Sequence, residues 1–154
     1  MNPSGRKRAV TLSEYVRRRN GVAMGAPGGL RNMLQRSFGA GSFGGFWRYW
    51  NPIWGYGLGK YVFAPLKKTL PPAVALVATF VVSGALHDVA TMLVSRSPAF
   101  LFTPWFFFCS LGVLLGRAVG MDLSERPWPV RATVNLVYLA VSLVIALVVR
   151  SSLM

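Results

Sequence analysis

The stretch FWRYWNPIWGYGLGKYVFAPL, residues 46–66, is the most unusual part of this chain. It holds three tryptophans, three glycines and two prolines around a single asparagine, Asn51. Aromatic residues at this density are typical of a membrane–water interface, whereas proline and glycine interrupt helices. Irregular backbone at membrane depth is stable only where protein or a wet cavity covers it. We therefore expect a re-entrant or interfacial segment that lines a cavity.

The composition of the 154-residue chain indicates a membrane protein. Hydrophobic residues make up 53% of the chain and the mean hydropathy is positive, above what a soluble domain of this size usually shows. A net charge of +13 is also typical of nucleic-acid-binding proteins. However, 12 of the 17 Lys and Arg residues precede position 69, in a glycine-rich segment that leads directly into apolar sequence. This asymmetry follows the positive-inside rule, so we expect a cytoplasmic N-terminus and no nucleic-acid partner.

The apolar runs predict an all-α membrane protein with two parts. Residues 1–45 form a basic cytoplasmic or interfacial arm, and residues 46–154 form the membrane domain. Within this domain we expect the re-entrant segment 46–66 and three spans, at 73–94, 99–119 and 132–149. Each span is near the roughly 20 residues that cross a bilayer. The short loop 96–98 predicts that the first two spans form a helical hairpin.

In the arm we expect two short helices, at 11–19 and 29–37, separated by glycines and a proline. Thr11 or Ser13 is the expected N-cap of the first. Arginines interleaved with apolar residues are typical of a segment on the membrane surface. For residues 1–10 a floppy tail is an equal alternative.

A polar residue recurs every four positions in the first predicted span: Thr79, Ser83, His87, Thr91 and Ser95. Side chains four apart lie one above another on a helix, so this stripe faces protein or a water-filled cavity. A histidine there has either a structural role, as a hydrogen-bond partner of a neighbouring helix, or a functional role. Imidazole titrates near neutral pH and can take a proton from a hydroxyl nucleophile, so proton transfer is the functional use that we favour.

Metal binding is not expected at His87. No second histidine, cysteine or carboxylate stands at ligand spacing beside it, and Asp88 lies about 100° around the helix. Cys109 is the only cysteine, which excludes an intrachain disulfide and a cysteine-based metal cage.

Two further polar features have open interpretations. Asn51 precedes Pro52 and suits the N-cap of a helix in which proline takes the first position. Its amide could equally donate a hydrogen bond to a developing oxyanion. Asn135, Tyr138 and Ser142 form a second polar stripe, on the third span, which we expect to face the first span.

Two motifs resemble those of the membrane-bound O-acyltransferase (MBOAT) family. FWRYWN, residues 46–51, resembles the family's Phe-x-x-x-Trp-Asn signature. FVVSGALHD, residues 80–88, resembles its apolar run that ends in Ser-Gly-x-x-His. The order and separation of Asn51 and His87 are also similar to the family pattern. The resemblance covers about residues 28–150 and corresponds to a short form of the family's C-terminal catalytic half.

The resemblance implies an enzyme that transfers an acyl group from an acyl thioester, acyl-CoA, to a hydroxyl acceptor. It implies no cofactor besides that donor substrate and no metal. His87 would be the general base and Asn51 a second catalytic residue. The implied substrate-binding neighbours are Trp47, Arg48, Trp50 and Ser83.

The alternative is a non-catalytic membrane scaffold or accessory subunit derived from the same family. A proton-conducting or transport component would need more ionisable groups in the spans than His87 and Asp88 supply. The expected partners are the lipid bilayer, acyl-CoA, and either a second copy of the chain or another membrane subunit. The bias toward Arg, Ala, Val and Gly indicates a bacterium, so we expect an integral protein of the plasma membrane.

Overall fold

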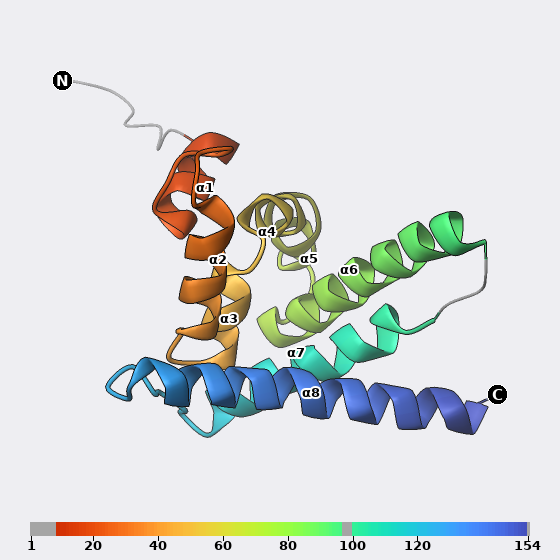
Figure 1. The fold of residues 1–154 in the computed structure, drawn as a ribbon. Coiled ribbons are helices and arrows are strands. Elements are labelled where there is room, and N and C mark those ends of the chain that lie inside the picture. Colours follow the sequence, from red (N-terminus) through yellow and green to blue (C-terminus); the bar gives the residue numbers. More distant parts are fainter. Residues whose placement is uncertain (1–8, 97–99, 154) are drawn as a thin grey trace.

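The fold is taken from a computed structural model of the chain, which describes residues 9–96 and 100–153 (Figure 1). Within these residues the regular secondary structure is helical and no strand occurs, in agreement with the predicted all-α class. Two parts of the predictions lie outside the described residues: the first eight residues of the arm, and residues 97–99, which include the expected start of the second span.

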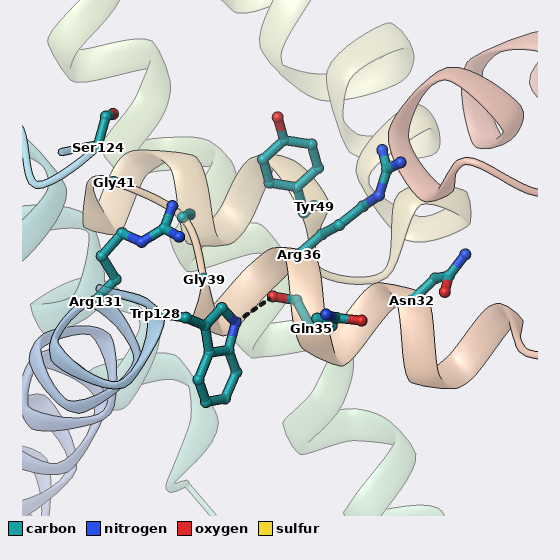
Figure 2. Close-up of a pocket in the computed structure, with 10 residues that line it drawn as sticks. Asn32, Gln35, Arg36, Gly39, Gly41, Tyr49, Ser124, Trp128 and Arg131 are labelled. Carbon is teal, nitrogen blue, oxygen red and sulfur yellow. Dashed lines mark hydrogen bonds between the residues drawn. The ribbon is translucent and has the colours of Figure 1, made fainter. Parts of the chain in front are cut away.

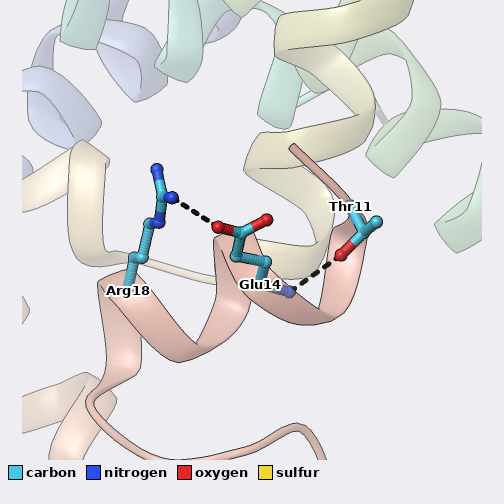
Figure 3. Close-up of polar contacts among 3 residues, drawn as sticks. All are labelled: Thr11, Glu14 and Arg18. Atoms are coloured by element: carbon cyan, nitrogen blue, oxygen red, sulfur yellow. Dashed lines mark hydrogen bonds and ion pairs between the residues drawn. The ribbon is translucent and has the colours of Figure 1, made fainter. Parts of the chain in front are cut away.

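Both predicted helices of the arm are present, as α1 (Leu12–Asn20) and α2 (Gly29–Phe38). Thr11 is the N-cap of α1, and its hydroxyl accepts a hydrogen bond from the Glu14 amide at 3.3 Å. The Glu14 carboxylate also pairs with Arg18 one turn later (Figure 3). The left-handed backbone of Gly21, with a φ of 81°, then ends the helix, because glycine adopts this conformation without steric cost.

The helices that follow the arm are α3 (Phe43–Tyr49), α4 (Pro52–Leu58), a π-helical turn (Gly59–Phe63), α5 (Ala64–Leu66), α6 (Pro72–Ser95), α7 (Phe102–Ala118) and α8 (Trp128–Leu153). The backbone stays right-handed through both ends of the π-helical turn, so residues 52–66 form one continuous helical run. The stretch 46–66 is therefore interrupted once, at Trp50 and Asn51, and its three glycines do not break the helix.

Helix α3 supplies the aromatic part of the core. Phe43 and Phe46 are buried and pack with Cys109 and Val113 of α7. On the other side the ring of Phe43 stacks on Tyr138 of α8, with centroids 4.8 Å apart. Because α3 begins at residue 43, the predicted boundary between arm and membrane domain falls inside a helix that packs against both α7 and α8.

Among the residues that the structure describes, two helices are long and apolar enough to cross a membrane, α6 and α8. Only 28% and 17% of their apolar segments are buried, whereas the core helix of a soluble protein would be mostly buried. Their length and composition therefore favour a membrane protein. The remaining predicted span corresponds to α7, whose 17 residues extend about 25 Å, less than the roughly 30 Å of a hydrocarbon core.

The polar stripe on α8 does not face α6, so that prediction was wrong. Asn135 is buried and donates hydrogen bonds to the carbonyls of Phe38 and Ala40 at 3.0 and 2.9 Å. Helix α8 packs mainly on α7, on the arm helix α2 and on α3. Helical periodicity identifies residues that share a face, but it does not identify the helix that this face meets.

The arm helices gather at one end of the long helices (Figure 1). At this end α6 begins, α7 ends and α8 begins, while the C-terminus lies at the opposite end. The basic arm and the connection between α7 and α8 therefore lie on the same side of the molecule.

Candidate functional site

A cavity of about 340 Å³ lies between α3, α4, α6 and α7. All six residues that the sequence singled out line it: Trp47, Arg48, Trp50, Asn51, Ser83 and His87. Ser83 is buried and His87 half-buried, whereas Arg48 and Asn51 are exposed. The two sequence motifs, which are some 30 residues apart in the chain, thus meet at one cavity.

The ring of His87 is oriented by its own helix. Its Nδ1 atom lies 2.7 Å from the carbonyl oxygen of Ser83, one turn earlier in α6. A carbonyl oxygen only accepts hydrogen bonds, so Nδ1 carries the proton and, in the neutral ring, Nε2 presents a lone pair. The neighbouring hydroxyls of the stripe behave similarly: Thr79 donates to the Ala75 carbonyl at 2.7 Å, and Thr91 donates to the His87 carbonyl at 2.8 Å.

Aromatic rings surround the imidazole of His87. The centroids of Trp54, Phe102 and Phe106 lie 5.5, 5.4 and 5.2 Å from its own. Trp54 and Phe106 present their rings at steep angles of 84° and 61°, the edge-to-face arrangement that aromatic pairs favour. These contacts restrict the rotation of the imidazole and exclude bulk water from part of its surface.

Asn51 is the N-cap of α4, as one of its two interpretations predicts. Its side-chain oxygen accepts a hydrogen bond from the Trp54 amide at 3.2 Å, and Pro52 takes the first helical position. Its φ of 39° is in the left-handed region, which asparagine tolerates better than most residues. Within the described part of the chain no group accepts a hydrogen bond from its amide nitrogen Nδ2, which stays available to a ligand in the cavity.

Trp54 connects the two motifs, although the sequence did not single it out. Its backbone amide bonds Asn51, its indole N–H donates to the Ser83 hydroxyl at 2.9 Å, and its ring packs on His87. The available signal was its position three residues after Asn51, where an N-cap side chain finds its backbone donor. Its long-range bond to Ser83 could not be read from that spacing.

Two arginines, Arg48 and Arg117, also line the cavity. Arg117 follows Phe106 by eleven residues on α7, which corresponds to about 16 Å along the helix. The charge of Arg117 is therefore separated from Phe106, one of the rings around His87, by about three turns of α7. None of the described residues that line the cavity is an Asp or Glu, so an anion there meets no fixed negative charge.

Asp88, the neighbour of His87, has a different role. Its buried carboxylate accepts hydrogen bonds from the backbone amides of Leu101, Phe102 and Thr103 and from the Thr103 hydroxyl, at 2.6 to 3.0 Å. These amides belong to the start of α7, whose first N–H groups have no partner within their own helix. Asp88 of α6 thus caps the start of α7, a role that no local sequence pattern indicates.

Comparison of the chain with protein families, with curated proteins and with solved structures found no match. The chemistry of the site therefore rests on its own geometry. A nitrogen lone pair and an amide donor line one cavity, together with two arginines. Such an arrangement can move a proton close to a bound anionic ligand.

Proposed function

We propose that this chain is a membrane-embedded enzyme that transfers an acyl group from acyl-CoA to a hydroxyl acceptor. The observation that supports this best is the cavity that His87 and Asn51 both line, with Nδ1 of the histidine occupied and Nε2 left as a base. The resemblance of the two motifs to membrane-bound O-acyltransferases supports the same reaction.

In the proposed reaction Nε2 of His87 takes the proton of the acceptor hydroxyl while the oxygen of this hydroxyl attacks the thioester carbonyl carbon. The amide of Asn51 donates a hydrogen bond to the oxyanion that develops. The tetrahedral intermediate then collapses, the carbon–sulfur bond breaks, and the thiolate of CoA receives the proton from the imidazolium. The products are the acyl ester and free CoA, and His87 returns to its neutral form.

The remaining cavity residues have corresponding roles in binding. Arg48 and Arg117 would pair with the phosphates of CoA, because guanidinium groups form strong charge-assisted hydrogen bonds with phosphate oxygens. Trp47, Trp50 and Phe106 provide an apolar wall for the acyl chain. Ser83, which holds Trp54, would position the substrate through that ring.

We further propose that α7 is a third span beside α6 and α8, in the plasma membrane of a bacterium. The N-terminal arm would lie in the cytoplasm and the C-terminus outside. The supporting observation is the charge distribution: the arm and the α7–α8 connection carry most of the arginines and lie at the same end of the long helices.

A scaffold or accessory subunit is the second candidate. It is favoured by one specific observation, that Asn51 already has a complete structural role as the N-cap of α4. In that case the His87 ring would serve packing, and both residues could be exchanged without loss of function.

The test compares acyl transfer in four proteins: wild type, His87→Ala, Asn51→Asp and the control Thr91→Ala. His87→Ala should reduce transfer by roughly 10²- to 10⁴-fold, the usual contribution of a general base. Aspartate keeps the oxygen that caps α4 but removes the amide donor, so Asn51→Asp separates the catalytic from the structural role. Thr91 bonds only its own helix and does not line the cavity, so its variant should retain full activity.

The assay follows labelled acyl groups from acyl-CoA into lipids or other hydroxyl acceptors, with the enzyme in its native membrane. Reaction of the buried Cys109 with a thiol dye on heating reports whether each variant is folded. Equal labelling in all four proteins, or none in the wild type, would favour the scaffold.

A further inference from the structure

A second cavity, of about 580 Å³, lies where α2, the α2–α3 connection and the start of α8 meet (Figure 2). None of the residues that line it also lines the first cavity. Its lining is mostly polar and includes Asn32, Arg36, Tyr49, Ser124 and Arg131. The role of this cavity is independent of the reaction proposed above.

Contacts between distant parts of the chain build the walls. The indole N–H of Trp128 donates to the Gln35 carbonyl at 3.0 Å, 93 residues away in sequence (Figure 2). Asn135 holds the α2–α3 connection through the carbonyls of Phe38 and Ala40. A methyl group at Gly41 would lie 2.4 Å from the Ser124 hydroxyl. The α2–α3 connection therefore approaches the α7–α8 loop so closely that only glycine fits at position 41 without a shift of its neighbours.

Two arginines give the cavity its charge. One N–H group of the Arg36 guanidinium donates a hydrogen bond to the Arg19 carbonyl at 3.1 Å, which leaves its other donors available. The Nε atom of Arg131 is buried and has no hydrogen-bond partner in the described part of the chain. Figure 2 shows the ring of Tyr49 between these two arginine side chains. No Asp or Glu is among the described lining residues.

The carboxylate of Asp122 forms no ion pair with these arginines. Asp122 lines an adjoining cavity, and its Oδ1 atom accepts hydrogen bonds from the amide and the hydroxyl of Ser124, at 2.9 and 2.6 Å. The single ion pair among the described residues joins Glu14 and Arg18 on α1. Within the described part of the chain the two guanidinium groups therefore have no carboxylate partner, and an anion in the cavity would compensate their charge.

The cavity also lies at a depth that suits a lipid headgroup. It opens at the first turn of α8, where this apolar helix begins with Trp128. Tryptophan at the end of an apolar helix is typical of the headgroup region. The two arginines are thus placed beside the level at which phosphates of anionic lipids lie.

We propose that this cavity binds a phosphate group through Arg36 and Arg131, with the hydroxyl of Tyr49 as an additional donor. Guanidinium groups match the oxygens of a phosphate in geometry as well as charge. The phosphate belongs either to an anionic phospholipid headgroup or to a soluble phosphate ester, and both present the same oxygens to the arginines.

Native mass spectrometry of the full chain in detergent tests this proposal. The probes are phosphatidylglycerol, zwitterionic phosphatidylcholine and soluble glycerol 1-phosphate. Arg36→Gln and Arg131→Gln should each weaken binding of the active probe by about tenfold or more, as expected for the loss of a charge-assisted hydrogen bond. Arg126→Gln is the matched control, because Arg126 is exposed in the same loop region and does not line the cavity.

A lipid source would be supported if the wild type and the control bind phosphatidylglycerol more tightly than phosphatidylcholine, and if the two cavity variants lose this preference. Binding of glycerol 1-phosphate with the same arginine dependence would support a soluble source. Absence of binding by both anionic probes would overturn the proposal. So would equal weakening in all three variants, because it would mean attraction by net charge alone. Thiol-dye unfolding at Cys109 confirms that the variants compared are folded.

Discussion

Replacing Gly84 by alanine tests the close approach of α6 to the start of α7. A Cβ atom at this position would lie 2.6 Å from the carbonyl oxygen of Phe102 and 2.7 Å from the Cα atom of Thr103. Both are backbone atoms, so no side-chain rotation can relieve the overlap and the two helices must separate. Separation would also strain the hydrogen bonds by which Asp88 caps α7, one turn further along.

Overpacking of a core costs about 1–3 kcal/mol, and the rigid backbone at this contact places Gly84→Ala near the upper end, at about 2–3 kcal/mol. For a chain of this length that corresponds to a fall in Tm of roughly 4 to 12 °C. The matched control is Gly57→Ala in α4, where a Cβ atom would meet nothing within 4 Å. Alanine there should leave stability unchanged or raise it by up to about 1 kcal/mol, since glycine is a poor helix former.

Thermal unfolding in detergent can be followed with a dye that becomes fluorescent on reaction with a thiol. Cys109 is the only cysteine of the chain and is fully buried, so the dye reports loss of the helical core without any engineered label. Equal unfolding temperatures for the Gly84 and Gly57 variants would refute the close packing of α6 on α7.

Three further outcomes are expected. Asp88→Ala should destabilise the chain by about 2–3 kcal/mol in the same dye assay, because the start of α7 loses its cap; a change below about 0.5 kcal/mol would contradict that role. The Ser124 hydroxyl and amide hold the pKa of Asp122 below its usual range. This carboxylate therefore stays charged, and the contact persists, at a pH where an ordinary aspartate is already protonated; the contact is lost only at still lower pH. Ser124→Ala should raise that pKa in an NMR titration, and an unchanged value would argue against the contact. In a cysteine-free background, an impermeant thiol reagent added outside should label cysteine at Ser152 and not at Ser4; labelling at Ser4 would reverse the proposed orientation.

Much of the candidate site could be predicted from the sequence because its signals are local. The four-residue recurrence of polar groups placed Ser83 and His87 on one face of a helix. The Asn–Pro pair at 51 and 52 indicated an N-cap, which the structure contains. That these two features line one cavity was inferred from their resemblance to a family pattern, since no local rule joins residues 36 positions apart.

The sequence by itself determined the long helices and the two short helices of the arm, where several of them begin, and which faces are polar, because caps and periodic burial depend on residues within a few positions of each other. The tertiary structure decided the partners of those faces. It directed Asp88 to the start of α7, joined Trp54 to Ser83, turned Asn135 toward the α2–α3 connection, and formed the cavity around Arg36 and Arg131. Such contacts depend on how whole helices pack, and helix packing is set by the shape and burial of many side chains at once.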